Sequence, residues 1–360
     1  MKSGTRILVT FSWVLLGLPI IFLAFITWKH KKPSESVNLM IENSQENRLP
    51  SYTPFQVTTF NIGYAGLDAK QDFFMDGGTG SRSRSKEQTK QNLQHMSSFL
   101  KEDHADFVLL QEVDIKAFRS FDQNEYQFFQ QELSYHASTF GYNYRNPWVP
   151  VPFLRPMGYV ESGLATFSTY FIQQATRFQL PGREPWPKQL FDLDRAMVEH
   201  MIPVENGKNL RIVNLHVSAY DAGGNIRKQQ LQYIKQYMHT QYQKGDYVII
   251  GGDWNQLLSD IQLQDPAFLA AWPKWLVRLP QDFTEGGFQW AVDSSVYTVR
   301  DNRTAYIKGK SFVTIIDGFL VSPNVEILQV KGHDLQFTHS DHNPVSAVFQ
   351  LQQNGKHTFE

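Results

Sequence analysis

The strongest indication of the fold is the stretch "DYVIIGGDWN", residues 246–255, in which a short apolar run ends abruptly in polar residues. A run of this length and composition, bounded by glycines, predicts a buried strand. Asp253 and Asn255 follow two residues apart, so on a continuing strand both side chains point to one face. The stretch therefore predicts a strand that delivers a carboxylate and an amide at its end.

Four other stretches show the same pattern of an apolar run that ends in polar residues. They are "FQVTTFN" (55–61), "DFVLLQE" (106–112), "LRIVNLH" (210–216) and "VTIIDGFLV" (313–321). Residues 85–103 and 225–242 have the apolar spacing of helices and lie between these strands. Strands that alternate with helices predict one α/β domain, with a sheet that is mixed rather than purely parallel.

The polar residues at the predicted strand ends are the candidate site. In layered α/β folds, strand ends direct side chains into a common crevice. One such residue could simply cap a turn. Six of them, all of types that bind hard cations or move protons, predict a shared site. They are Asn61, Glu112, His216, Asp253, Asn255 and Asp317.

The chemistry of these residues favours a metal ion and a phosphate. Glu112 follows three apolar residues, and a carboxylate with few other charged ligands suits Mg²⁺, which keeps waters and recruits phosphate oxygens. The amide of Asn61 can hold a metal-bound water or a phosphate oxygen without adding charge. Near the C-terminus, "FTHSDHNPVSAVF" (337–349) adds Asp341 and His342 before another apolar run.

The composition excludes several alternatives. The chain has 34 Lys and Arg residues against 35 Asp and Glu residues, so no global positive field indicates nucleic-acid binding. A polyanionic substrate must therefore meet local charge or a metal. The absence of cysteine excludes disulfides, thiolate zinc sites and a cysteine nucleophile.

The N-terminus carries an apolar segment, residues 7–28, without a charged residue. At about 1.5 Å per residue it is long enough to cross a hydrocarbon core of about 30 Å. No small-residue cleavage site follows, so residues 1–28 are interpreted as a transmembrane signal anchor, with a cleaved signal peptide as the alternative. Positive residues flank both ends and leave the orientation open. We expect a single-pass protein of the cell membrane with its catalytic domain outside the cytoplasm.

The rest of the chain is divided by composition. Residues 29–53 are polar and contain prolines, and are predicted to form a tether that need not fold. Residues 54–352 are predicted to form the catalytic domain, and residues 353–360 a C-terminal tail.

The ordered series of motifs resembles the endonuclease/exonuclease/phosphatase superfamily, whose fold is like that of deoxyribonuclease I. The matching stretches are "TFN", "LLQE", "SGLATFS", "NLHVS", "GGDWN", "IDGFLVS" and "HSDHNPV", in the order of the family across residues 55–351. The resemblance implies a four-layer α/β sandwich, in which two mixed sheets pack face to face and helices flank them. It also implies a metal-dependent phosphoric ester hydrolase with Mg²⁺, or alternatively Mn²⁺, as cofactor.

The resemblance further implies a role for each site residue. Glu112 would be the principal Mg²⁺ ligand, with Asn61 and Asp341 close to the metal. His342 would abstract a proton or contact the scissile phosphate, oriented by Asp317.

Asp253 would position or deprotonate the attacking water, and Asn255 would hold a phosphate oxygen. His216 occupies a position that carries a histidine in the sphingomyelinases and in deoxyribonuclease I, where the base-excision endonucleases have asparagine. This difference favours the branches other than abasic-site repair.

Three residues outside these motifs are given separate interpretations. Arg227, after the His216 loop, is a candidate phosphate ligand, with a solvated helix residue as the equal alternative. Arg195, before a predicted strand, is interpreted as structural rather than as a ligand. His200, in "MVEHMIPV", is interpreted as a strand residue that faces solvent.

Three functions remain open at this point. The preferred one is a membrane-anchored, monomeric phosphodiesterase or phosphatase that acts on a small or lipid phosphate. Two stretches rich in proline and bulky apolar residues, 146–163 and 268–283, either cover the core or use their aromatic side chains to line the groove or touch a membrane surface. The second is an exported or anchored non-specific endonuclease of the same fold. The third, a non-catalytic binding protein, is disfavoured by the intact set of site residues.

Overall fold

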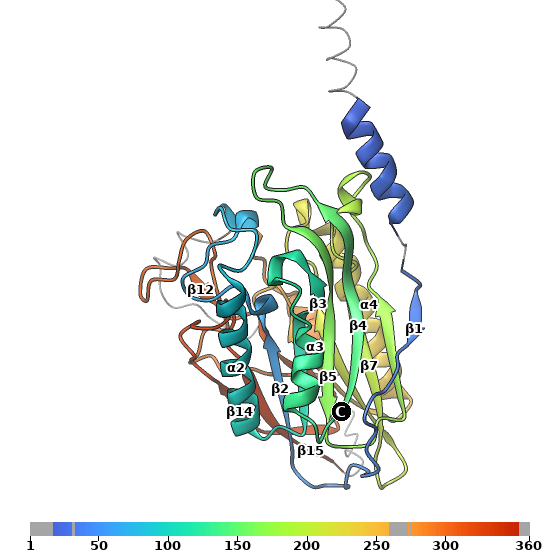
Figure 1. The fold of residues 1–360 in the computed structure, drawn as a ribbon. Helices are drawn as coiled ribbons and strands as arrows, with labels where there is room; N and C mark the ends of the chain where they lie inside the picture. The colour runs from blue at the N-terminus through green and yellow to red at the C-terminus, as the bar shows by residue number, and fades with distance from the viewer. Residues whose placement is uncertain (1–16, 31–32, 259–272, 274, 353–360) are drawn as a thin grey trace, which may run out of the picture.

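The strands of the chain build two mixed sheets that face each other (Figure 1). The computed structural model describes residues 17–30, 33–258, 273 and 275–352. The seven-stranded sheet has the order β1 (Ser36–Asn38), β6 (Gln174–Gln179), β7 (Ala196–Pro203), β8 (Asn209–His216), β9 (Tyr247–Asp253), β13 (Asp317–Val321) and β10 (Gln289–Ala291). The six-stranded sheet has the order β14 (Val325–Gly332), β15 (Val345–Leu351), β2 (Phe55–Asn61), β3 (Phe107–Ala117), β5 (Gly158–Ser168) and β4 (Ala137–Val149). A small ribbon pairs β11 (Val299–Arg300) with β12 (Val313–Thr314).

Each large sheet contains one parallel pair, and a helix makes each crossover. Helix α2 (Lys86–Asp103) joins β2 to β3, and α4 (Asn225–Gln243) joins β8 to β9. The Ser85 side chain accepts a hydrogen bond of 3.1 Å from the Gln88 backbone N–H, which caps the start of α2. Helix α3 (Glu125–Glu132) lies between β3 and β4. The described residues of the domain also form short 3₁₀ turns: η1 (Gly63–Ala65), η2 (Phe74–Asp76), η3 (Phe118–Ser120), η4 (Lys188–Leu190), η5 (Ala222–Gly224) and η6 (Gln281–Thr284).

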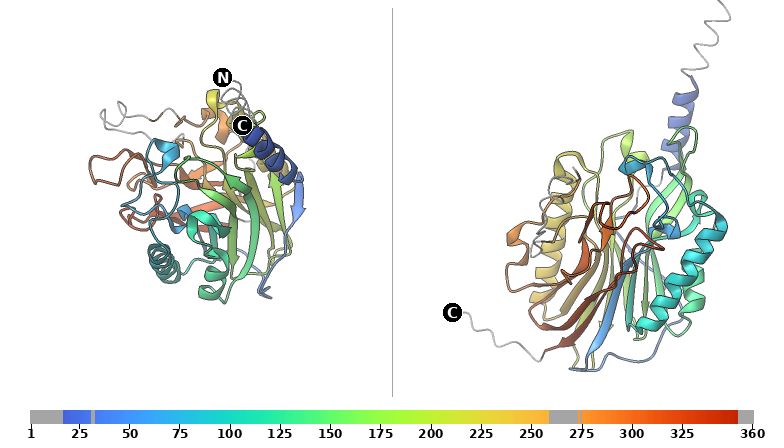
Figure 2. Two further views of the ribbon diagram at one scale, coloured as in Figure 1. Left: turned by 45° about the horizontal axis from the view of Figure 1, so that its top comes forward. Right: turned by 90° about the vertical axis from the view of Figure 1, so that its left-hand side faces the viewer.

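The four layers follow from the alternation of side chains along the strands. On β3, Phe107 and Leu109 point into the core between the sheets, whereas Val108 and Leu110 point to the outer layer under α2. Figure 2 shows α2 and α3 outside one sheet and α4 outside the other. The predicted four-layer α/β sandwich is therefore confirmed.

A buried amide pair joins the two sheets through this core. Gln111 of β3 donates to the Oδ1 atom of Asn214 of β8 at 2.8 Å. Asn214 donates in turn to the carbonyl oxygens of Leu110 and Ala165 in the opposite sheet, at 3.1 and 3.0 Å. Both amides are completely buried; Gln111 directly precedes the site residue Glu112, and Asn214 lies two residues before the site residue His216.

The predicted elements agree with the structure except in detail. The strand expected over residues 313–321 is broken, because β12 ends at Thr314 and β13 begins at Asp317. His200 does not face solvent as interpreted from the sequence, since it is fully buried between the sheets. There the Thr139 hydroxyl lies 2.7 Å from Nε2, and the Ile212 carbonyl oxygen lies 3.2 Å from Nδ1.

The predicted tether is partly built into the fold. Residues 36–38 form β1 at the edge of the seven-stranded sheet, and Leu49 is fully buried in the inter-sheet core. The expectation that residues 29–53 need not fold is corrected by these contacts, because a few apolar residues in a polar segment suffice to dock it. The predicted catalytic domain, residues 54–352, contains every other strand, and residues 353–360 lie outside the described part of the chain.

Residues 17–29 form a helix that precedes β1 (Figure 1). Among the described residues, no helix combines the length and apolar character needed to cross a membrane. Residues 1–16, which include the start of the predicted apolar span, lie outside the described residues.

Candidate active site

Three adjacent strands of the seven-stranded sheet place three site residues in one row. In the register of β8 with β9, His216 is paired with Asp253, and in that of β13 with β9, Asp317 is paired with Asp253. The row exists because β13 runs antiparallel to β9 and begins where β9 ends. All three side chains are buried.

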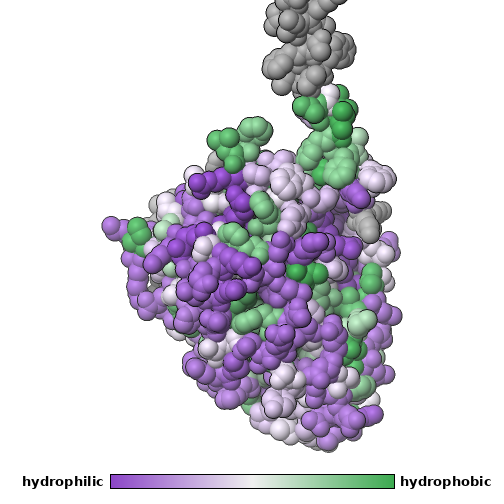
Figure 3. Space-filling view, in the orientation of Figure 1, coloured by the Kyte–Doolittle hydropathy of each residue, from purple (hydrophilic) through white to green (hydrophobic). Residues whose placement is uncertain are grey.

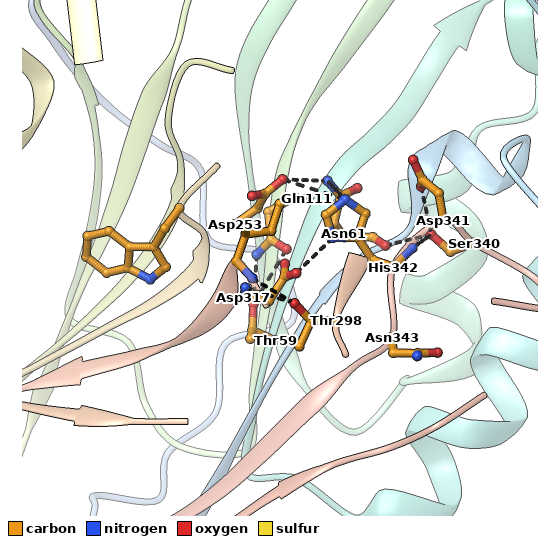
Figure 4. A network of polar contacts seen from close by, with 12 residues as sticks. Thr59, Asn61, Gln111, Asp253, Thr298, Asp317, Ser340, Asp341, His342 and Asn343 are labelled. Carbon is orange, nitrogen blue, oxygen red and sulfur yellow. Dashed lines mark hydrogen bonds and ion pairs between the residues drawn. The ribbon is translucent and has the colours of Figure 1, made fainter. Parts of the chain in front are cut away.

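The six-stranded sheet supplies the residues that face this row. His342 precedes β15, and its Nδ1 atom lies 2.9 Å from Oδ2 of Asp317. Its Nε2 atom lies 3.8 Å from Oδ2 of Asp253. Asn61, the last residue of β2, donates to the same Asp253 oxygen at 3.0 Å, and its Nδ2 lies 3.4 Å from the His342 Nε2 atom. Figure 4 shows His342 between Asp317 and Asn61, with Asp253 beyond the amide of Asn61.

The charges in this group shift the pKa values of both partners of Asn61. Burial alone would lower the pKa of His342, but the charge and hydrogen bond of Asp317, together with the charges of Asp253 and Asp341, outweigh it and raise that pKa to about 10. Burial, reinforced by the negative charge of Asp317, raises the pKa of Asp253 to about 7. At neutral pH the group therefore holds an imidazolium donor beside a carboxylate that can take up a proton.

His216 and Asn255 lie on the two sides of Asp253. His216 Nε2 is 3.4 Å from Oδ2 of Asp253, and burial lowers the pKa of His216 well below its usual range, so its imidazole is neutral. The backbone N–H of Asn255 donates to Oδ1 of Asp253 at 2.8 Å, and its side-chain amide donates to the Val217 carbonyl at 3.0 Å. Asn255 thus orients Asp253 in this structure, and its predicted contact with a phosphate oxygen stays a prediction.

Glu112 is delivered by a distortion of strand β3. Its φ of 55° lies in the left-handed region, and the pairing of β3 with β5 is irregular between Leu110 and Val113. Such backbone strain in a non-glycine residue is concentrated at functional sites. The Oε1 atom lies 3.4 Å from Nδ2 of Asn61, and burial raises the pKa of the Glu112 carboxyl.

Arg119 lies next to the Glu112 carboxylate, and this residue was not predicted from the sequence. Its guanidinium makes a bidentate contact with Asp114 at 2.9 and 3.1 Å, and its Nη2 atom lies 4.0 Å from Oε2 of Glu112. The same guanidinium stacks on Tyr64, 3.9 Å from the ring centroid. No sequence motif indicates this residue, because its partners come together only through the turn after β3 and the β2–α2 loop.

Asp341 lies beside the β2–α2 loop. Its Oδ2 accepts a hydrogen bond of 2.7 Å from the amide of Asn302, and its Oδ1 lies 3.3 Å from the Ser340 hydroxyl. A Cβ atom on Gly63, whose φ is 51°, would lie 2.7 Å from Oδ1 of Asp341. Glycine at this position therefore leaves room for the carboxylate of Asp341.

Two groups of these residues could hold a metal ion. Asp253, Asp317 and His342 each offer a ligand atom, and the three atoms lie within 4.8 Å of one another. Glu112 and Asp341 offer a second, all-oxygen group that lines the same pocket. Asn61 turns its donor nitrogen toward Asp253, while its oxygen accepts from the Gly63 N–H at 3.0 Å, so as an oxygen ligand it would have to reorient.

The pocket above these residues has a volume of about 150 Å³ and reaches across both sheets. Arg195 lines it and is only 8 % exposed, yet its Nη1 atom has no hydrogen-bond partner within the described residues. A buried cation whose donor is unsatisfied is suited to an anionic ligand. The interpretation of Arg195 as merely structural therefore misses its place in the pocket wall.

Arg227 does not join this group. Its guanidinium donates to the Asp221 carboxylate and to the Trp275 carbonyl, and its side chain is buried. Both alternatives from the sequence, a phosphate ligand and a solvated residue, are at odds with these contacts. Arg227 instead fixes the loop between β8 and α4.

Two loops meet over the pocket at a contact that the sequence does not indicate. The hydroxyl of Tyr220, in the loop between β8 and α4, donates to Oδ1 of Asp76, in the loop between β2 and α2, at 2.5 Å. One loop belongs to each sheet, and both residues line the pocket. We call this hydrogen bond the Tyr220–Asp76 bridge.

The comparisons with known proteins agree with the geometry. Residues 58–342 match the model of the Endonuclease/Exonuclease/phosphatase family. The matched region extends from within strand β2 to His342. No curated protein sequence matches the chain.

Solved structures with the same fold include two bacterial proteins of this family. One, from Beutenbergia cavernae DSM 12333, is 15% identical with a TM-score of 0.56, over 83% of this chain and 72% of that one. The other, from Bacteroides vulgatus, is 18% identical with a TM-score of 0.53, over 83% of this chain and 100% of that one.

A third similar structure is D. rerio TDP2 complexed with a single-strand DNA product. It is 13% identical with a TM-score of 0.51, over 83% of this chain and 99% of that one. At these identities the likeness establishes the fold, and the family match establishes the class of chemistry. The chain belongs to the Endonuclease/Exonuclease/phosphatase family and is a phosphoric ester hydrolase.

Proposed function

We propose that this protein is a membrane-anchored, Mg²⁺-dependent hydrolase of small or lipid phosphate esters and acts as a monomer. The observation that carries the choice of substrate is the Tyr220–Asp76 bridge. A continuous polynucleotide needs a groove that is open at both ends. The bridge joins the two walls of the pocket and favours a substrate that enters by one end.

The charge of the chain supports the same choice. The formal net charge is −1, and duplex binding without sequence preference depends on many Lys and Arg residues that neutralise phosphates. Local cations suffice for a single phosphate group. Arg195 supplies one of them in the pocket wall.

The residues of the site suit hydrolysis by direct attack of water. Asp253 takes a proton from the water while the oxygen of the water bonds to phosphorus. Asn61 and Asn255 hold the Asp253 carboxylate in place. The bond from phosphorus to the leaving oxygen breaks, and the imidazolium of His342 protonates that oxygen. Asp317 keeps the imidazole of His342 in the required orientation.

The donor set fits Mg²⁺. Glu112 and Asp341 offer hard oxygen ligands to the pocket, and burial destabilises the charge of Glu112, which a cation would offset. When bound, a divalent ion would stabilise the negative charge that builds up on the phosphoryl oxygens. Mn²⁺ has the same preference for carboxylate oxygens and is the alternative ion.

One parallel assay tests the proposal. Purified full-length chain with Mg²⁺ is given bis-p-nitrophenyl phosphate, sphingomyelin in vesicles and plasmid DNA. We expect hydrolysis of a small or lipid ester and little nicking of plasmid. Nicking of DNA without cleavage of either ester would instead establish the nuclease alternative.

A variant pair connects the result to the Tyr220–Asp76 bridge. Tyr220→Phe removes the hydroxyl and keeps the ring, whereas Tyr233→Phe makes the same change on the outer helix α4. We expect the first variant to gain activity on bulky esters relative to small ones, and the second to keep the ratio. An unchanged ratio in Tyr220→Phe would show that the bridge does not limit substrate size.

The anchor and its orientation are tested separately. The apolar segment of residues 7–28 supports a membrane anchor. We expect the chain to stay in the membrane fraction after a high-salt wash and to be digested by protease added outside intact spheroplasts. Recovery of the chain in a soluble fraction would argue for the cleaved signal peptide.

A further inference from the structure

The loop between β4 and β5, residues 150–157, presents bulky apolar side chains to solvent. Phe153 is 90 % exposed and Leu154 is 88 % exposed, and Val151 beside them is also exposed. The loop is held by hydrogen bonds of 3.0 Å from Met157 N–H to the Val151 carbonyl and from Arg155 N–H to the Pro152 carbonyl. We call these residues the β4–β5 tip. Its apolar side chains are therefore presented by a fixed turn.

The N-terminal helix, residues 17–29, lies at the same end of the molecule. The ring of Phe22 stacks on Phe191 with centroids 6.2 Å apart, and Tyr144 of β4 donates to the Phe191 carbonyl at 3.0 Å. Strand β4 continues from Tyr144 to the β4–β5 tip. The helix is therefore connected to the tip through Phe191 and strand β4.

The outer surface of this end is apolar. The helix exposes Leu18, Ile20, Ile21 and Trp28, and the loop before η4 exposes Trp186. Figure 3 shows the apolar side chains gathered in two places at this end, on the helix and on the tip beside it. Exposed apolar side chains gathered at one end of a molecule in this way mark an interaction site.

The flanking residues indicate which partner covers this surface. Lys29 lies over the ring of Trp28 at 4.6 Å, and Arg155 follows the apolar pair of the tip. Tryptophan and basic side chains beside an apolar surface are typical of the boundary between hydrocarbon and lipid headgroups. A protein partner would not require this arrangement next to an apolar N-terminal segment.

The catalytic pocket extends toward the same end of the molecule. Its lining includes Met157 of the tip, and also Tyr144 and Phe191, which connect the N-terminal helix to β4. Because Glu112 and Arg195 line the same pocket, it reaches from the catalytic residues to residues beside the apolar surface.

We propose that the β4–β5 tip inserts into a lipid bilayer beside the N-terminal helix and turns the pocket toward the membrane surface. The partner is the headgroup and upper acyl region of a bilayer that carries anionic lipid. This inference rests on the proposed action on lipid esters and adds a second membrane contact to the proposed anchor.

The absence of cysteine in the chain allows a direct test. Leu154→Cys, labelled with an environment-sensitive NBD fluorophore, reports on the β4–β5 tip. Tyr135→Cys is the matched control, since Tyr135 is 87 % exposed but precedes β4, at the end of the strand away from the tip. Both full-length variants are placed in vesicles of phosphatidylcholine and phosphatidylglycerol, with and without lipids that carry a quencher at a shallow acyl position.

We expect the fluorescence emission of the label at position 154 to shift to the blue and to be quenched by the quencher lipids. The emission of the label at position 135 should remain the same as in water. If chain that floats with the vesicles gives the same solvent-exposed signal at both positions, the tip does not insert. If the chain does not float with the vesicles, the inference fails together with the anchor.

A second variant separates this inference from the proposed function. Phe153→Ser with Leu154→Ser removes the apolar pair without touching the catalytic residues. We expect unchanged hydrolysis of a soluble ester and a loss of about tenfold or more on the same ester in vesicles. Equal rates of wild type and variant on vesicles would overturn the inference. A wild-type chain that cleaves neither ester refutes the proposed function, while the NBD signals still decide whether the tip inserts.

Discussion

The Nδ1 atom of His342 lies 2.9 Å from Oδ2 of Asp317, although the two residues belong to different sheets. Asp317 belongs to the row of site residues in the seven-stranded sheet, and His342 precedes β15 of the six-stranded sheet. This contact and the hydrogen bond from Asn61 to Asp253 join the two halves of the active site.

Asp317→Asn should lower kcat by about 10²- to 10⁴-fold, because the amide can neither stabilise the imidazolium of His342 nor fix its tautomer. Steady-state hydrolysis of a soluble ester measures the effect. Asp282→Asn, on an exposed turn, is the control and should be neutral. Loss of activity with an unfolded circular dichroism spectrum would instead mean a structural effect.

Glu112→Gln should weaken binding of Mg²⁺ by at least about tenfold, because one of the two carboxylates offered to the ion loses its charge. Isothermal titration calorimetry without substrate measures the metal affinity directly. Glu87→Gln, in the exposed first turn of α2, makes the same change away from the site. Equal Mg²⁺ affinity in the two variants would refute Glu112 as a ligand.

Arg195→Met should lower kcat/KM by about 10- to 100-fold, the loss expected for a charge-assisted contact to phosphate. Its thermal midpoint should stay the same or rise, because a buried guanidinium with an unsatisfied donor disfavours the folded state.

The matched control for that variant is Arg227→Met. Its partner Asp221 is buried and would lose its counter-charge, so this variant should lower the thermal midpoint strongly. If Arg195→Met proves as destabilising as Arg227→Met, Arg195 has structural partners and the role assigned to it is wrong.

The buried His200 should make the protein less stable in acid. Burial lowers the pKa of His200 to about 4, against about 6.5 in the unfolded chain, so the unfolded state binds the extra proton between these values. Stability is therefore lost as the pH falls from about 6.5 to about 4, by about 3 kcal/mol in total. Denaturant unfolding of wild type and His200→Gln at several pH values measures the difference. Parallel pH profiles of the two proteins would contradict the assignment.

Much of the catalytic centre could be predicted from the sequence because its residues end strands. The apolar runs before Asn61, Glu112, His216 and Asp253 are local patterns, and a sheet brings such ends to one edge. The interpretation of Arg227 failed for the opposite reason. Its partners, Asp221 and the Trp275 carbonyl, meet it only in the folded chain, and no local pattern separates a buried arginine from a ligand.

The segment before the catalytic domain shows a similar limit. Its composition is polar, but the single residue Leu49 is completely buried against the inter-sheet core. An average over a window does not detect one docked side chain. The Tyr220–Asp76 bridge is likewise invisible in the sequence, because it joins loops that are 144 residues apart.

The buried amide pair of Gln111 and Asn214 has a consequence for how the enzyme tolerates change. Apolar side chains can slide past one another at little cost, but a paired amide in a dry interior fits at one position only. The hydrogen-bonded pair therefore fixes the position of one sheet relative to the other, and with it the relative position of the two halves of the catalytic centre. Core substitutions that leave the chain folded but shift the two sheets relative to each other would abolish activity. Substitutions in the loops around the pocket should therefore be tolerated more often than substitutions in the core between the sheets.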